Sequence, residues 1–258
     1  AINAADPTMR TSALRLAADH YRDRIESGKL LAASDPNSIK AIDVQMSSHQ
    51  GLGNVLWMLE DSEGARAAFV AALDHANKLE SLDEDNRTRR MRDRAIALQG
   101  IALIDSDSNP MKALPRIKEA IEVSQALVAL DPDNARRPRD LALMLAIRGK
   151  VLVAHAVDVN AGVEDYTRCA DLLTTRAVES PRETTAQTDL RDTLLELADV
   201  LEAAGRSTTA SNILNSAITQ LTCVASAEAR AGDSSWTVIL ESLNSRTDAL
   251  AGATLDGQ

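Results

Sequence analysis

The chain has 258 residues, of which 45% are apolar but only 2% are aromatic. Strands favour β-branched and aromatic side chains, whereas this sequence is built mainly from Ala, Leu, Arg, Glu and Asp, which favour helices and their exposed faces. The composition therefore predicts an all-α fold and argues against a large β-sandwich.

The chain is acidic, with 38 acidic and 28 basic residues and a formal net charge of −10. This balance opposes general attraction to nucleic acid or to anionic membranes. No stretch approaches the roughly 18 to 20 apolar residues that a membrane span needs, and the opening residues lack the pattern of a signal peptide. We therefore expect a soluble chain that neither binds nucleic acid nor inserts into a membrane. Its compartment and its oligomeric state stay open.

Turn signals recur about every 48 residues along the chain. Each signal offers Asp or Ser as a helix cap, and three of the four carry proline early in the next element. The period predicts four helix pairs, over residues 35–82, 83–130, 131–179 and 180–231. The signals are Asp35-Pro36-Asn37, Asp83-Glu84-Asp85-Asn86, Asp131-Pro132-Asp133-Asn134 and Ser180-Pro181.

The ends of the chain extend this pattern by one helix each. Residues 11–34 are predicted to form the second helix of a half repeat. Residues 234–251 are predicted to form a capping helix, because Trp236, Ile239 and Leu243 fall on one helical face. Each pair can bury its apolar face only against its neighbours, so the prediction is one domain over residues 1–258.

A large residue recurs at one point of each repeat, with a small residue four positions before and usually another three positions after it. Spacings of four and three share one helical face, on which the small residues let a neighbouring helix approach. Phe69, with Ala65 and Ala72, is therefore expected to be buried between helices. Cys169 takes a small-residue position in this pattern and is expected to be buried. The large residues are Tyr21, Phe69, Ile117, Tyr166 and Leu214.

The first full repeat resembles the tetratricopeptide repeat family. Its Leu52-Gly53, Leu56, Ala65-x3-Phe69 and Ala72 match the family's pattern in type and separation. His49 stands where the family usually has Trp, and Leu56 where it has Tyr. The period also exceeds the usual length of about 34 residues, but the excess is close to four helical turns, so core positions keep their face.

The resemblance implies a right-handed superhelical stack of roughly ten helices, with a concave wall that holds a protein or peptide. Similar repeats of this length belong to bacterial signalling proteins such as serine/threonine kinases. The matching wall positions are Ser47, Gln50, Asn54 and Trp57 in the first full repeat, Lys150 in the third, and Asp192, Asp199 and Glu202 in the fourth. The middle repeats contribute Ala95, Leu98, Ala102, Leu143 and Ala146. Trp57 is expected to be partly exposed as a binding anchor; the alternative is an unoccupied surface with Trp57 packed on a neighbour.

Arginines crowd two helix starts that lie one repeat apart and that stacking would bring together. Positive charge at a helix N-terminus opposes the macrodipole, so nearby anions are expected. They come either from the chain's own Asp83, Asp85, Asp131 and Asp133 or from an acidic or phosphorylated partner. The arginines are Arg87, Arg89, Arg90, Arg92 and Arg94 in the first group and Arg136, Arg137 and Arg139 in the second.

Motifs of catalysis and of metal or cofactor binding are not found in the sequence. Gly51-Leu52-Gly53 lacks the third glycine and the preceding strand of a dinucleotide loop. The four histidines show no i, i+4 pairing, so a zinc site is not expected, and His49 is expected to pack in the core. Asp189 with Asp192 has a spacing that would allow an acid and base pair, but a solvated face is the simpler interpretation.

The leading hypothesis is a non-catalytic interaction scaffold, part of a larger signalling protein. The alternative is a sensor that binds a small ligand or peptide between its helices. An enclosed apolar pocket of several hundred Å³ would favour the sensor, and an open groove would favour the scaffold.

Overall fold

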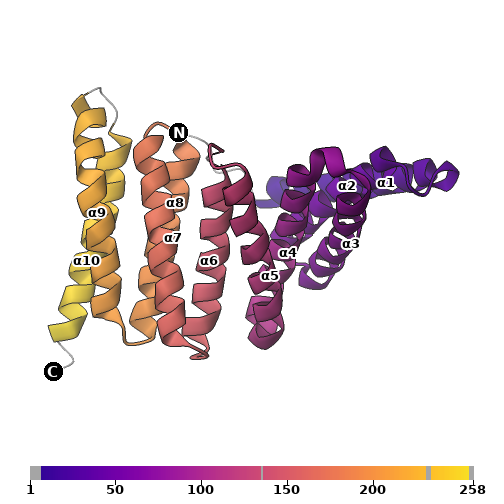
Figure 1. Ribbon diagram of the computed structural model, residues 1–258. Helices are drawn as coiled ribbons and strands as arrows, with labels where there is room; N and C mark the ends of the chain where they lie inside the picture. The colour runs from indigo at the N-terminus through magenta and orange to yellow at the C-terminus, as the bar shows by residue number, and fades with distance from the viewer. Residues whose placement is uncertain (1–6, 135, 231–233, 256–258) are drawn as a thin grey trace. The chain divides into compact units, whose positions relative to one another are not determined.

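The computed structural model describes residues 7–134, 136–230 and 234–255, which form ten α-helices, one short 3-10 helix and no strand. The all-α fold predicted from composition is confirmed (Figure 1). The helices are α1 (Pro7–Ser34), α2 (Ile39–Met58), α3 (Ser62–Leu82), α4 (Arg87–Ser108), α5 (Pro110–Leu130), α6 (Arg136–Ala154), α7 (Val159–Glu179), α8 (Thr184–Ala203), α9 (Ser207–Arg230) and α10 (Ser235–Leu255), with the 3-10 helix η1 (Glu84–Asn86) before α4.

Each predicted segment contains the helices expected of it. We call α2, α4, α6 and α8 the first helices and α3, α5, α7 and α9 the second helices of their pairs; α1 takes the place of a second helix and α10 that of a first. Side-chain caps begin several of them: Ser38 accepts from the amide of Ala41 in α2, and Asp61 accepts from Gly64 in α3. Such caps satisfy amides that a helix start leaves without partners.

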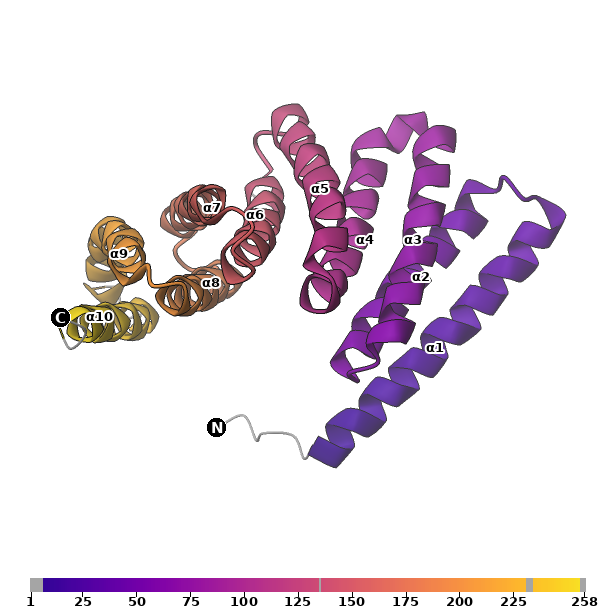
Figure 2. The same ribbon diagram turned by 90° about the horizontal axis from the view of Figure 1, so that it is seen from below.

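The helices form two compact units, Ala1–Leu130 and Asp131–Gln258. The division falls at a predicted repeat boundary. In unit 1, consecutive helices from α1 to α5 pack against one another. In unit 2, α6, α8 and α10 form one layer and α7 and α9 the other (Figure 2). The single superhelical stack expected over the whole chain stays a prediction.

Polar contacts between successive first helices follow the period of the sequence. In unit 1, Gln50 of α2 donates to the carbonyl of Asp93 in α4, 43 residues away, at 2.9 Å. In unit 2, Lys150 of α6 pairs with Glu196 of α8, 46 residues away, at 2.9 Å. Arg246 of α10 donates to Asp199 of α8, 47 residues away, at 3.0 Å. Residues about one repeat apart are therefore neighbours in space, as expected of a helical repeat.

Phe69 lies in the core between three helices, as predicted. A Cβ atom added to Gly53 of α2 would lie 2.9 Å from its ring, and one added to Gly100 of α4 would lie 2.6 Å away. Ala65 and Ala72 are fully buried on the same face of α3. The two glycines let α2 and α4 close on the ring from both sides, so Phe69 links two repeats.

The first described helix, α1, behaves as half a repeat. Its Tyr21 is half-buried, whereas Phe69, at the same point of the next repeat, is buried. Leu31 is 49% exposed, whereas the equivalent Leu79 is fully buried against Ile42 and Met46 of α2. The difference arises because no first helix precedes α1 in the described chain.

Three of the turns between a first and a second helix contain a left-handed residue. Glu60, Ala156 and Gly205 have φ of 62°, 51° and 71°, and they occupy equivalent positions in three of the repeats. This conformation closes the carboxyl end of a helix and suits glycine, since a Cβ atom strains it. Only one of the three repeats carries glycine there, which explains why the sequence gives no uniform turn signal at this point.

Candidate functional site

The α2 part of the predicted wall is only partly open. Asn54 is exposed, but Ser47 is half-buried, with its hydroxyl 3.3 Å from the carbonyl of Val44. The amide of Gln50 is occupied by its bond to α4. Trp57 is partly exposed, as predicted, yet it also packs against the core cluster that contains Phe69. Trp57 thus combines the predicted partial exposure with the packing of the alternative, and its role as a binding anchor stays a prediction.

The middle of the expected wall is not a groove in α4. Ala95, Leu98 and Ala102 are buried in the core of unit 1, so the prediction that they line an open apolar surface is wrong. Leu143 and Ala146 of α6 are half-buried. Asn54, at the same point of the preceding repeat as the buried Ala102, is exposed, so equivalent positions are not covered alike in the two repeats.

The wall positions of unit 2 carry charges that pair between helices. Lys150 pairs with Glu196, and Arg246 reaches both Asp199 and Glu202 at 2.8 and 2.6 Å. Asp192 is exposed and pairs with the adjacent Arg191. The side chain of Asp199 is 70% exposed despite its partner, so its carboxylate stays accessible to other cations.

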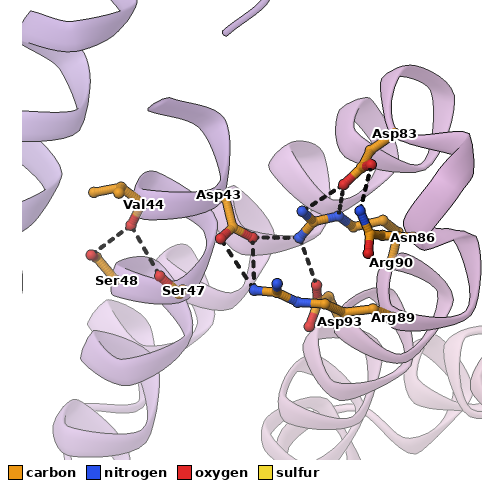
Figure 3. A network of polar contacts seen from close by, with 9 residues as sticks. All are labelled: Asp43, Val44, Ser47, Ser48, Asp83, Asn86, Arg89, Arg90 and Asp93. Carbon is orange, nitrogen blue, oxygen red and sulfur yellow. Dashed lines mark hydrogen bonds and ion pairs between the residues drawn. The ribbon is translucent and has the colours of Figure 1, made fainter. Parts of the chain in front are cut away.

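Two members of the first arginine group, Arg89 and Arg90, are paired with carboxylates of unit 1 (Figure 3). Arg90 is buried and pairs with Asp83 at 2.7 Å, with Asp93 at 3.3 Å and with Asp43 of α2. Arg89 reaches Asp43 at 3.2 Å. Hydrogen bonds from Asn86 and Arg90 lower the pKa of Asp83, whereas burial raises the pKa of Asp93. The guanidinium of Arg90 thus joins two first helices and the turn between repeats.

Other members of this group differ in exposure. Arg94 pairs with Glu80 of α3 and Glu119 of α5, at 3.0 and 2.8 Å. Arg92 is half-buried, and Arg87 is exposed. Internal pairing therefore accounts for Arg89, Arg90 and Arg94, which favours the internal alternative over an external anion for these three.

In the second arginine group, Arg137 and Arg139 likewise pair with carboxylates, which belong to unit 2. Arg139 makes a two-pronged contact with Asp189 of α8, which also pairs with the buried Arg176 at 3.5 Å. Arg137 is buried, with its Nε atom 3.4 Å from the carboxylate of Asp131. Arg136 is exposed and lines an open cavity at the start of α6. Arg136 is therefore the arginine of this group that is best placed to contact an external anion.

Two histidines that are 26 residues apart in the sequence meet between α2 and α3 of unit 1. The rings of His49 and His75 stack with centroids 5.6 Å apart and an interplanar angle of 22°. The Nδ1 atom of His49 is buried without a hydrogen-bond partner among the described residues. Burial, His75 and Lys29 together lower the pKa of His49 from its ordinary value of 6.5 to about 4, and burial likewise lowers the pKa of His75. His49 packs against His75 but is half-buried, so its predicted place in the core is confirmed only in part, and the pair itself was not foreseen.

The histidine pair predicts an acid-sensitive unit 1. Because folding lowers the pKa of His49, the unfolded chain binds a proton more readily, so the stabilisation is full above about pH 6.5 and is lost towards pH 4. A shift of this size corresponds to roughly 3 kcal/mol, and we expect about 1–2 kcal/mol because the ring is only half-buried. Urea denaturation of the parent and of His49→Gln at pH 7.5 and pH 5 measures the difference.

The glutamine variant should lose less stability between these pH values than the parent. His155→Gln is the matched control, since His155 is exposed and its replacement should leave the parent's pH dependence in place. Equal losses in the parent and in His49→Gln would show that His49 does not contribute.

The cavities on the described part of unit 2 include a wide one and two that are about half-enclosed. A polar one of about 520 Å³ is lined at the start of α6 by residues that include Asp131, Arg136 and Arg176. One of about 310 Å³ lies beside it, between Pro132, Pro138 and the exposed side of α7. Another of about 310 Å³ lies between the carboxyl ends of α6 and α8, with Val153, Val200 and Asp199 among its walls.

Reactive and metal-binding groups are sparse in the part of the chain that the structure describes. Cys169 is fully buried at its small-residue position, as predicted, and burial raises the pKa of its thiol to about 12. Asp189, half of the suggested acid and base pair, is occupied by two arginines. Over residues 7–134, 136–230 and 234–255 no group of three or more His, Cys, Asp or Glu side chains could hold a metal ion. Over the same ranges, no helix combines the length and the apolar character needed to cross a membrane.

Comparison with known proteins adds no function. No protein-family model matches the chain, and a comparison with curated proteins finds no match. Among solved structures, the chain is similar to BtubC (BKLC) from P. vanneervenii, with 13% sequence identity and a TM-score of 0.42 over 94% of this chain and 92% of that chain. A likeness this weak carries no argument, so the function has to be inferred from the residues described above.

Proposed function

We propose that this chain is a non-catalytic module that holds a protein or peptide partner, with side chains of the partner seated in recesses on its surface. The observation that carries the proposal is that unit 2 has recesses that open to solvent at least in part and that have helix ends and charged side chains at their walls. A peptide side chain can enter such a recess while the peptide backbone stays on the surface. The resemblance to tetratricopeptide repeats points to the same class of function.

The chemistry of the chain supports a non-catalytic role. The Cys169 thiol is inaccessible, and its raised pKa keeps it protonated at neutral pH. The carboxylate of Asp189 is already paired with the guanidiniums of Arg139 and Arg176. The resemblance to repeat regions of bacterial signalling proteins is the basis for proposing a regulatory part of a larger protein.

Peptide display on the immobilised chain tests this proposal. Selection from a random library should enrich peptides that share a motif and bind with micromolar affinity. If the α2 surface takes part, Trp57→Ala should weaken binding about 30-fold, since an interfacial tryptophan contributes about 2 kcal/mol. Because Trp57 also packs on the core, we expect this variant to lose about 1–3 kcal/mol of stability, so binding is measured well below its unfolding midpoint.

Met58→Ala is the matched control for the α2 surface, because Met58 is 57% exposed and is not one of the predicted wall positions. Failure to enrich any shared motif, together with stabilisation by members of a metabolite library, would contradict the scaffold and favour the sensor.

A further inference from the structure

The cavity between the carboxyl ends of α6 and α8 combines apolar walls with one acidic group. Its volume is about 310 Å³. Five of its lining residues are small or medium aliphatic side chains, and the sixth is a carboxylate. They are Val153, Ala154, Val200, Ala203, Ala204 and Asp199.

Two helix ends make this cavity electronegative. α6 ends at Ala154 and α8 at Ala203, and both residues line the cavity. Most of the last carbonyls of both helices accept from turn amides, as Val153 does from Ala156 and Glu202 from Gly205, but each helix still directs the negative end of its dipole towards the cavity. Neither α6 nor α8 has a basic residue in its last turn to offset this charge. The cavity therefore attracts a cation more strongly than Asp199 alone would.

The surroundings of Asp199 extend the negative surface along α8. Glu196 lies on the same exposed side of the helix, where it pairs with Lys150. Asp199 and Glu202 share a single guanidinium, that of Arg246 in α10. Since Asp199 is 70% exposed, a second cation can reach it from solvent, and it competes with Arg246 for the carboxylate. The net charge of −10 further favours the approach of a basic partner.

We propose that this cavity receives a lysine or arginine side chain of a basic peptide. The aliphatic stem packs against Val153 and Val200, and the charged end meets Asp199 and the two helix ends. An apolar side chain would add no charge partner for Asp199 beyond Arg246, and an acidic one would be repelled. The inference rests on the proposed function and names the chemistry of the partner at one site.

Two small probes that differ by the terminal amino group test the cavity directly. Nα-acetyl-lysine amide and Nα-acetyl-norleucine amide share the aliphatic stem, but only the first carries a charge. Methyl NMR spectra of the full chain should show shifts at Val153, Ala154, Val200 and Ala203 with the lysine probe. We expect the norleucine probe to bind threefold to fivefold more weakly, and the lysine probe to weaken with added salt, as for an exposed ion pair.

Two variants should change the affinity of the lysine probe in opposite directions. Asp199→Asn should weaken it about threefold to fivefold, and Arg246→Gln should strengthen it because it releases Asp199. Circular dichroism controls for the fold of both variants. Equal affinity of the two probes, or an Asp199→Asn variant that binds the lysine probe like the parent, would overturn the inference.

Peptide display separates this inference from the proposed function. The enriched motif should contain Lys or Arg, and its affinity should fall in Asp199→Asn. Motifs without basic residues, unaffected by Asp199→Asn, would overturn the basic-peptide inference and leave the scaffold function standing. Binding of the lysine probe without enrichment of any peptide would count against the scaffold function and leave the cation-binding cavity standing.

Discussion

Replacing Phe69 by Ala is expected to lower the free energy of unfolding of unit 1 by about 3–5 kcal/mol, the usual cost of emptying a buried aromatic site. The ring lies against Gly53 and Gly100, and neither glycine has a side chain that could move in to fill the space. The resulting cavity would lie between α2, α3 and α4 and would weaken the contact between two repeats. The loss of stability should therefore extend beyond the helix pair that carries Phe69.

The two tryptophans allow this loss to be assigned. Trp57 is in unit 1 and Trp236 is in unit 2. In a Trp236→Phe background, the emission of Trp57 during urea denaturation follows unit 1 alone. Met58→Ala is the control, because Met58 is 57% exposed on the neighbouring helix and should change stability by less than about 0.5 kcal/mol. A loss below about 1 kcal/mol for Phe69→Ala would show that the repeat register is wrong.

The sequence predicted the helices well because their determinants are local. Turn residues and caps mark where helices start, and the spacing of large and small residues marks the face that packs. The capping helix predicted at residues 234–251 is observed at Ser235–Leu255, with Trp236 and Leu243 in the core. Such features depend on residues within one or two helical turns of each other.

Contacts between helices were harder to predict, since they depend on how far one helix is staggered and rotated against the next. The meeting of His49 with His75 has no signature within either helix. The contact between Arg139 and Asp189 does have a signature in the sequence, because Asp189 lies 50 residues further on, close to one full period. A search for opposite charges about one repeat apart would have found this pair and the pair formed by Lys150 and Glu196.

The capping helix links stability to the proposed binding surface. Arg246 of α10 holds Asp199 and Glu202, so the position of α10 sets how accessible these carboxylates are. Arg246 also stands about one period after Ala198, at the repeat position that Gly53 and Gly149 hold in earlier repeats. At those two glycines the aromatic ring of a second helix packs closely. A long arginine there does not allow such close approach, and its guanidinium turns to the carboxylates of α8 instead.

Replacing Trp236 by Ala is expected to lower the free energy of unfolding of unit 2 by about 3–5 kcal/mol. Trp236 is fully buried at the start of α10, and its Nε1–H donates to the carbonyl of Pro181 at 2.7 Å. Trp236→Phe keeps most of the packing but loses this hydrogen bond. We expect the lost bond to lower the free energy of unfolding by about 1 kcal/mol, in addition to the loss caused by the smaller ring. Urea denaturation followed by circular dichroism measures both variants, while Trp57 emission reports whether unit 1 stays unchanged.

Loss of Trp236 should also loosen the whole of α10 and, with it, the hold of Arg246 on Asp199. The Trp236→Ala chain, kept under conditions where unit 2 remains folded, should then bind the lysine probe more tightly than the parent while being less stable. Opposite changes in stability and affinity are expected only if α10 competes for Asp199, because simple damage to unit 2 would lower both together. A parallel fall of stability and probe affinity would therefore show that α10 supports the cavity instead of competing for it.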